Sequence, residues 1–366
     1  MNRRQFLSSS GAAAAGLAGG ALAPGSVYAA TSKRALMKLG ATVRQCDDAS
    51  LKALARYGIQ NIVASPAIGE ARLYATVEEL KRIRDAADRN GMSIEILTPP
   101  NLASSHIDRE KNPAIMLGQS PERDRDIEAV QTMIKNCAAA GIPAIKYNMS
   151  ILGVLRTGRA PGRGDATYSH FKLSDARPNT PLTRAGRVTE DMYWERITYF
   201  LERVIPVANE YKIRMACHPN DSMTPPEGYQ GVNAVLSTVD GLKKFVSIKE
   251  SPFHGLNFCQ GTVAEMLQDP GKEIYEVIRY FGSRKKIFMV HFRNIIGNRQ
   301  EFSEVGPDEG VVDMVKAMQM YKEVGYSGII CPDHTVQAPN DPGGAQYMAY
   351  VYGYIRALIQ AADRLV

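Results

Sequence analysis

Eight short apolar runs, each followed by a helical pattern, extend along most of this 366-residue chain. The expected strands are residues 35–40, 61–65, 93–98, 143–147, 213–217, 255–259, 286–291 and 328–331. The expected helices are residues 49–57, 77–90, 123–140, 189–211, 239–248, 262–281, 310–324 and 345–365. Such alternation is typical of repeated βα units around a parallel sheet. Eight units predict an α/β fold of the (β/α)₈ TIM-barrel type, with a doubly wound sheet as the alternative.

One long stretch, residues 152–184, interrupts this repeat after the fourth strand. It is rich in Gly, Arg, Pro and Ser, and it shows no helical or strand periodicity. A loop of this length inside a compact domain is usually functional or disordered. No Ser/Gly linker divides the chain, so we expect residues 31–366 to form a single catalytic domain.

The first thirty residues have the composition of an export signal. Arg3 and Arg4 precede Phe6, a short Ala/Gly-rich apolar run follows, and small residues end the segment near Ala30. This order of basic, apolar and small residues is that of a signal peptide, and the paired arginines resemble the twin-arginine signal of bacteria. We therefore expect residues 1–30 to be a twin-arginine signal peptide. The mature protein is then expected in the periplasm, without stable insertion in the membrane after cleavage.

Charge and cysteine content limit the remaining classes of function. The net charge of +6 falls to +4 without residues 1–29, which is too mild and too evenly spread to indicate nucleic-acid binding. The five cysteines are an odd, scattered set rather than a disulfide framework. A thiolate kept in an oxidising compartment is best explained by metal binding or deep burial.

Four potential metal ligands occupy equivalent positions in consecutive units. His218 directly follows the fifth strand, Cys259 and His291 end the sixth and seventh, and Asp333 follows the eighth, so that successive members are 41, 32 and 42 positions apart. The carboxyl ends of barrel strands meet at one rim, where active sites of this fold lie. The sequence therefore predicts one metal site, although a lone histidine is more often a hydrogen-bonded core residue and a lone cysteine a small hydrophobe.

Side-chain alternation and donor chemistry refine this site. If His218 faces the barrel interior, Cys217 faces the helices and is structural. Cys331 has the same parity as Asp333 and is expected one layer deeper in the barrel. Two imidazoles, a thiolate and a carboxylate suit Zn²⁺, Fe²⁺ or Mn²⁺ more than Mg²⁺.

Several motifs together resemble the D-mannonate dehydratase family. They are residues 205–208, 214–221, 258–261, 290–293 and 332–334, with further agreement at 147–148, 302–304 and 312–314. The resemblance implies a xylose-isomerase-like barrel with a divalent metal, commonly Mn²⁺ or Fe²⁺. It also implies a hydro-lyase that removes water from D-mannonate to give 2-dehydro-3-deoxy-D-gluconate.

The same resemblance assigns roles to individual residues. It implies that the four residues above are the metal ligands and that His334 is catalytic. It also implies a catalytic tyrosine near the start of the last helix, where Tyr347 is the first choice and Tyr350, Tyr352 and Tyr354 are the alternatives. His334 can donate a proton to the departing 3-hydroxyl group. Arg293 is expected to pair with the substrate carboxylate, its alternative being a salt bridge at the rim. Tyr147 and Asn148, after the fourth strand, are expected to contact the substrate.

Two other classes of function remain open from the sequence. One is a periplasmic metal-dependent isomerase, epimerase or β-eliminating lyase that acts on another sugar. The other is a non-catalytic sugar-acid binding protein, which would not need His334 beside a metal ligand. In each case the expected partner is a small-molecule sugar acid, and the sequence leaves a homo-oligomer open.

Overall fold

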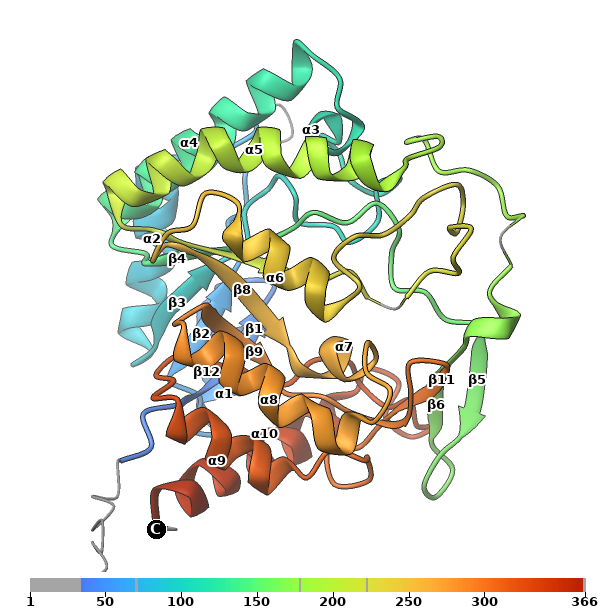
Figure 1. The fold of residues 1–366 in the computed structure, drawn as a ribbon. Coiled ribbons are helices and arrows are strands. Elements are labelled where there is room, and N and C mark those ends of the chain that lie inside the picture. The colour runs from blue at the N-terminus through green and yellow to red at the C-terminus, as the bar shows by residue number, and fades with distance from the viewer. Residues whose placement is uncertain (1–33, 70–71, 178, 222, 365–366) are drawn as a thin grey trace, which may run out of the picture. The chain divides into compact units, whose positions relative to one another are not determined.

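Eight parallel strands close into a barrel in the computed structural model, which describes residues 34–69, 72–177, 179–221 and 223–364 (Figure 1). In order around the barrel they are β1 (Lys38–Val43), β2 (Asn61–Ala64), β3 (Ser93–Leu97), β4 (Ala144–Asn148), β7 (Arg214–His218), β8 (His254–Cys259), β9 (Ile287–His291) and β12 (Ile329–Cys331). The predicted TIM barrel is confirmed, and the doubly wound alternative is wrong. The expected signal peptide lies outside the described residues.

An outer ring of helices covers the barrel. Its members are α1 (Asp48–Ala55), α2 (Val77–Arg89), α4 (Glu122–Ala140), α5 (Glu190–Tyr211), α6 (Val239–Ser247), α8 (Pro270–Ser283), α9 (Met314–Glu323) and α10 (Ala345–Arg364). Sequence signals set their ends: α2 starts at a capping box formed by Thr76 and Glu79, and Gly91 follows it with a φ of 68°. Of the helices described, none is both long and apolar enough to cross a membrane.

Alternation along the strands separates two apolar cores. The smaller core fills the barrel interior, and its members are Val63, Ile96, Ala144, Met289, Ile329 and Cys331. The larger core lies between the strands and the helices, and it contains Cys217. The predicted orientations of Cys331 toward the interior and of Cys217 toward the helices are therefore confirmed.

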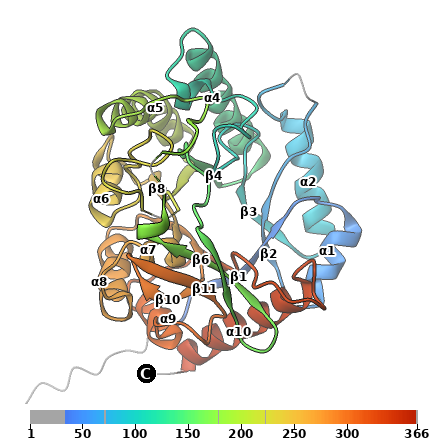
Figure 2. The ribbon, with the colours of Figure 1, turned by 90° about the vertical axis from the view of Figure 1, so that its right-hand side faces the viewer.

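A second, antiparallel sheet of four strands was not expected. Its strands are β5 (Gly158–Pro161), β6 (Thr167–Lys172), β10 (Asn294–Asn298) and β11 (Glu301–Val305), in the order β10-β11-β6-β5. The expectation of an irregular loop at 152–184 is thus wrong, because this segment holds β5, β6 and the short helix η1 (Leu173–Asp175). Figures 1 and 2 together place this sheet at the end of the barrel toward which the strand arrows point.

Two element boundaries also differ from the expectation. The single helix expected over 262–281 is divided into α7 (Gln260–Ala264) and α8, since Pro270 occupies the first turn of α8, where proline is well tolerated. The first strand lies three residues later than expected. A further short helix, α3 (Ala114–Leu117), lies in the long connection between β3 and α4.

Candidate active site

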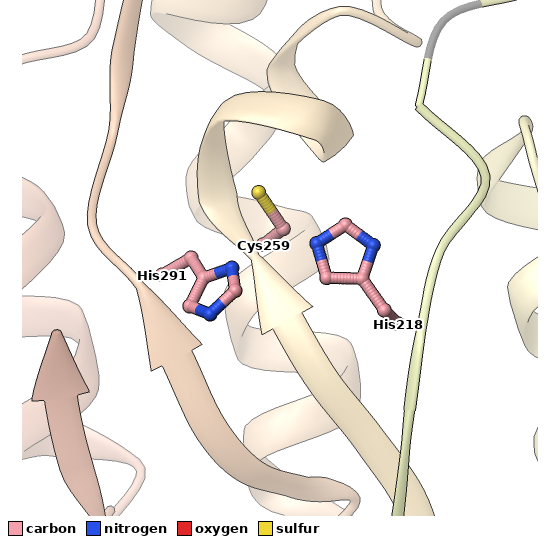
Figure 3. A group of neighbouring side chains, drawn as sticks. All are labelled: His218, Cys259 and His291. Atoms are coloured by element: carbon pink, nitrogen blue, oxygen red, sulfur yellow. The ribbon is translucent and has the colours of Figure 1, made fainter. Parts of the chain in front are cut away.

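Three of the predicted metal ligands lie side by side at the ends of β7, β8 and β9 (Figure 3). Cys259 and His291 are direct neighbours in the parallel register of β8 and β9. One ligand atom from each of His218, Cys259 and His291 lies within 4.8 Å of the other two. Two metal bonds of about 2.0–2.3 Å to nitrogen and sulfur span at most about 4.6 Å, so small side-chain adjustments suffice for one ion to reach all three atoms.

Asp333 reaches the same place from the loop after β12. Its Oδ2 lies 3.3 Å from the Sγ of Cys259, and its Oδ1 lies 3.4 Å from the Nδ1 of His291. The fold therefore brings all four candidate ligands together at one rim of the barrel. Metal binding by them stays a prediction.

The hydrogen bonds of the two imidazoles fit a metal ion. Nδ1 of His218 donates to the carbonyl oxygen of Pro219 at 2.7 Å, which leaves the Nε2 lone pair for a metal. Nδ1 of His291 is buried and makes no hydrogen bond among the described residues. Burial lowers the pKa of His218 to about 4 and the pKa of His291 well below its ordinary value. Both rings are thus neutral near pH 7, as metal ligation requires.

The thiol of Cys259 fits as well, although it needs a positive partner. Burial, followed by Asp333, raises the pKa of Cys259, so that the thiol alone stays protonated at neutral pH. The Oγ1 of Thr262 and the Nη2 of Arg293 lie 3.1 and 3.6 Å from its sulfur. A bound divalent cation would convert it to the thiolate, which is the form that binds metal.

Arg293, the predicted partner of the substrate carboxylate, is only 4% exposed and is engaged by the protein itself. Its Nε donates to Asp333 at 3.1 Å, and its Nη2 donates to Asp221 at 3.1 Å. Its Nη1 contacts both Glu265, at 2.6 Å, and Glu304, at 2.5 Å. The structure therefore places Arg293 as a support for Asp333 and disagrees with the predicted contact to the substrate.

A second arginine joins this charge cluster from the segment before β5. Arg156 donates to Asp221 at 2.8 Å and also contacts Glu304 and Glu265. Burial, with Asp221 second, raises the pKa of Glu265 to about 8. Burial also raises the pKa of Glu304, but Arg293 and its other cationic neighbours outweigh this and bring it to about 2. The pKa values of Glu265 and Glu304 are thus shifted in opposite directions, although both side chains contact Arg293.

The imidazole of His334 lies between the charge cluster and the metal ligands. Its Nδ1 is 2.8 Å from Glu304 Oε1, its Nε2 is 4.0 Å from Asp333 Oδ1, and its side chain is 34% exposed. Asp333 raises the pKa of His334 to about 9 against the effect of burial, and Glu304 contributes in the same direction. His334 is therefore a charged, partly accessible proton donor. A ligand-like group of Asp221, Glu304 and His334 also exists, but the two arginines already neutralise its acids.

Tyr347 lies beside these groups. Asp333, His334 and Tyr347 line a common cavity of about 10 Å³, and burial raises the pKa of Tyr347. Tyr350, one turn further along α10, instead donates to Asp308 at 2.6 Å and is 38% exposed. Of these two tyrosines, Tyr347 is the one that the structure brings to the candidate site.

The two residues predicted from β4 have different positions. Asn148 is paired in register with His218 and so lies at the site, and its side-chain amide donates to Ala103 O at 2.9 Å. Tyr147 is 1% exposed and packs on Phe200 of α5, with 5.6 Å between the ring centres. The structure contradicts a substrate contact for Tyr147, because alternation turns it toward the helices.

Two interior residues near the ligands were missed in the sequence. Lys146 shares the inward parity of Ala144 and Asn148 on β4, and Asn257 shares that of Cys259 on β8. Asn257 is fully buried, and its amide nitrogen lies 3.5 Å from the Nε2 of His291. Counting two residues back from Cys259 on β8 would have found Asn257, and counting two back from Asn148 on β4 would have found Lys146.

A closed barrel of eight parallel strands surrounded by helices, with polar side chains at its C-terminal rim, defines a TIM-barrel protein. Mannonate dehydratase from Streptococcus suis serotype 2 has a similar structure, with a TM-score of 0.75 and 24% sequence identity over 90% of this chain and 94% of that one. A xylose isomerase domain protein from Planctomyces limnophilus has a TM-score of 0.57 at 12% identity over 90% of this chain and 99% of that one.

Sequence comparison identifies the family. Residues 172–366 match the family described as D-mannonate dehydratase (UxuA). The mannonate dehydratase of Shouchella clausii is 30% identical over 292 residues, which is 70% of this chain and 76% of the relative. That of Thermotoga petrophila is 28% identical over 293 residues, which is 70% of this chain and 77% of the relative. The chain belongs to the D-mannonate dehydratase family, and it is a sugar-acid hydro-lyase.

Proposed function

We propose that this protein is a metal-dependent dehydratase that converts D-mannonate to 2-dehydro-3-deoxy-D-gluconate and water. The observation that carries this proposal is the convergence of His218, Cys259, His291 and Asp333 beside His334. We further propose that the ion held there is Mn²⁺ or Fe²⁺, with Zn²⁺ also compatible with the donors. Such an ion would act as a Lewis acid toward the substrate.

The proposed reaction assigns a role to several side chains of the site. The C2–H bond breaks and its proton passes to a base or to water at the rim, the C3–O bond breaks as the 3-hydroxyl takes up a proton and leaves as water, and the enol moves the proton of its 2-hydroxyl to C3 to give the 2-ketone. His334 donates the proton that turns the departing 3-hydroxyl into water, since its imidazolium is partly exposed beside the ligands. Glu304 holds that ring through Nδ1, and Arg293 holds Asp333. Tyr347 lines the same cavity and is proposed to assist proton transfer.

The decisive experiment is incubation of metal-loaded protein with D-mannonate, with 2-dehydro-3-deoxy-D-gluconate as the measured product. Formation of this product with Mn²⁺ or Fe²⁺ supports the proposal, and its absence with both metals rejects D-mannonate as the substrate. Exchange of deuterium at C2 without elimination would indicate an epimerase or isomerase instead.

Variants separate metal binding from catalysis. We expect His218→Ala and Cys259→Ala to lose bound metal, which is measured by elemental analysis. We expect His334→Asn to retain the metal and to lose turnover by about 10²–10⁴-fold, the usual contribution of a general acid. An active His334→Asn variant would show that another group donates the proton.

We also propose that residues 1–30 direct export of the folded protein by the twin-arginine route, so that residues 31–366 act in the periplasm. The paired residues Arg3 and Arg4 support this proposal. A double substitution of Arg3 and Arg4 by lysine should retain the protein in the cytoplasm, which cell fractionation measures. Export of this variant at the wild-type level would argue for a different route.

A further inference from the structure

Lys146 is a charged side chain in the barrel interior that has no assigned role. It lies on β4 two residues after Ala144, which belongs to the interior core. Since side chains on one face of a strand recur at every second residue, Lys146 points inward, one layer nearer to the rim. Its register neighbour on β7 is Ala216, two residues before His218, and this small side chain occupies little of that layer.

The ammonium of Lys146 lies within electrostatic reach of the candidate metal ligands. Burial lowers its pKa, while Asp333 and Cys259 are among the groups that act in the opposite direction. Lys146 in turn contributes to the lowered pKa values of His218 and His291. The residue as a whole keeps some exposed surface, although burial is the largest influence on its ammonium.

No anion of the protein neutralises this ammonium by direct contact. Throughout the part of the chain that the structure describes, Lys146 makes no hydrogen bond and no ion pair within 4.0 Å. The buried Lys286 shows the contrasting case, since its Nζ lies 2.7 Å from both Glu250 Oε1 and Ser251 O. Burial acts on the ammonium of Lys146, and lysine ammonium groups that are removed from water in proteins are normally paired. An unpaired ammonium group beside a binding site indicates that the molecule bound there supplies the anion.

The arginines near the site are already committed to other partners. Arg293 contacts four carboxylates, and Arg156 contacts three of the same four, including Asp221 and Glu304. An incoming carboxylate at either guanidinium would meet these acids at close range, and like charges repel. Among the described residues, no carboxylate lies within ion-pair distance of the ammonium of Lys146.

We infer that the ammonium of Lys146 binds the carboxylate of the sugar acid, an inference that rests on the proposed function. In such a substrate the carboxylate carbon is bonded to C2, the carbon that loses its proton. Loss of this proton increases the negative charge on the carboxylate oxygens, and a fixed ammonium in a site shielded from water stabilises that charge. Lys146 thereby selects acids over neutral sugars and lowers the barrier to proton removal.

The test is a binding measurement that does not depend on turnover. The probes are the 3-deoxy analogue of D-mannonate, which has no 3-hydroxyl to lose, and its neutral primary amide. Both are titrated by calorimetry into the metal-loaded full-length protein, its Lys146→Met variant and its Lys286→Met variant. Methionine keeps much of the length of lysine without its charge. Metal content and melting temperature are recorded for each protein.

We expect Lys146→Met to weaken binding of the acid by about 10- to 100-fold, as for the loss of one charge-assisted hydrogen bond. Its binding of the amide and its metal content should change less than twofold. Lys286→Met, at the opposite end of β9 from His291, should lower the melting temperature and leave the preference for the acid intact. Equal effects of Lys146→Met on acid and amide, or no effect, would overturn the inference.

The same data distinguish this inference from the proposed function. A wild-type protein that prefers the acid through Lys146 but forms no product from D-mannonate disproves the proposed reaction and keeps the role of Lys146. A wild-type protein that dehydrates D-mannonate while Lys146→Met retains full acid affinity disproves the role of Lys146 and keeps the reaction.

Discussion

The side chain of Asn257 adjoins a candidate metal ligand and supplies a test of the site that does not require the substrate. Its Nδ2 lies 3.5 Å from His291 Nε2, and its Oδ1 is buried without a hydrogen-bond partner among the described residues. A half-turn of the amide exchanges these two atoms. Oδ1 then accepts from Nε2–H and fixes the tautomer whose Nδ1 lone pair faces Cys259 and Asp333.

We therefore expect Asn257→Leu to lower metal affinity by about 10- to 100-fold, the usual effect of removing the partner of a ligating histidine. Titration of the metal-free protein with Mn²⁺ measures this change. Asn257→Asp keeps an acceptor at the same place and should bind metal more tightly than Asn257→Leu. Wild-type affinity in Asn257→Leu would show that another group orients His291.

A second buried histidine, His254, predicts how stability depends on pH. Its Nε2 lies 2.9 Å from the carbonyl oxygen of Phe245, and its Nδ1 has no partner in the described part of the chain. Burial lowers the pKa of His254 to about 4, below the value of about 6.5 in an unfolded chain. As the pH falls from 6.5 to 4, protons bind the unfolded state preferentially, and the free energy of unfolding decreases by up to about 3 kcal/mol.

His254→Gln removes this titration and retains an amide N–H toward Phe245. We expect its melting temperature to decrease less than that of the wild type between pH 7 and pH 5. Thermal unfolding across this range measures the difference between the two proteins, so other titrating groups cancel. Parallel decreases in both proteins would contradict the assignment to His254.

Residue by residue, the sequence predicted the four ligand candidates better than the residues around them. Each ligand stands at a visible change from apolar to polar residues at a strand end. Lys146 and Asn257 lie inside strands, where only the side-chain parity relative to a known interior residue distinguishes them. Tyr147 was misplaced because the family resemblance covers it together with Asn148, whereas strand alternation places the two side chains on opposite faces of β4.

At the scale of elements, the hairpin of β5 and β6 is tied to the site by Arg156. This arginine lies two residues before β5 and pairs with Asp221 and Glu304. We expect Arg156→Met to destabilise the protein by about 3–5 kcal/mol, because it leaves buried carboxylates with one cation fewer. Chemical denaturation measures the loss, and limited proteolysis should show faster cleavage within 158–172.

Arg159→Met is the matched control on the same hairpin. The guanidinium of Arg159 is exposed and contacts Ser169 Oγ at 3.3 Å. Its removal should change stability by no more than about 0.5 kcal/mol. Similar losses in the two variants would mean that the hairpin is held by its backbone pairing rather than by Arg156.

The strands that the sequence did not predict are those whose partner strands lie far away along the chain. Barrel strands are continuous apolar runs, which are visible in a single segment. Strand β6, by contrast, is paired with β11, and Phe171 lies opposite Phe302 across 131 residues of sequence. The alternating pattern of β6 is short and lies between Gly and Arg residues. The sequence of β6 therefore does not indicate that it pairs with β11, and the sequence of β11 does not indicate β6.

At the scale of the whole molecule, the candidate ligands come from four neighbouring strands and so couple metal binding to the stability of the barrel. We expect Mn²⁺ at one hundred times its dissociation constant to stabilise the folded protein by about 2.7 kcal/mol. Melting temperatures with Mn²⁺ and with a chelator measure this effect. Cys259→Ala should respond much less, and an equal response would place the stabilising ion elsewhere.

The order of the strands has a consequence for how the protein is made. Asp333 follows β12, which is the last strand of the barrel along the sequence and closes it against β1. A ribosome has therefore synthesised His218, Cys259 and His291 before the fourth ligand exists. Complete coordination of the proposed ion would have to wait until the last strand is in place. Acquisition of the ion would thus be a late step in biogenesis that marks a finished barrel.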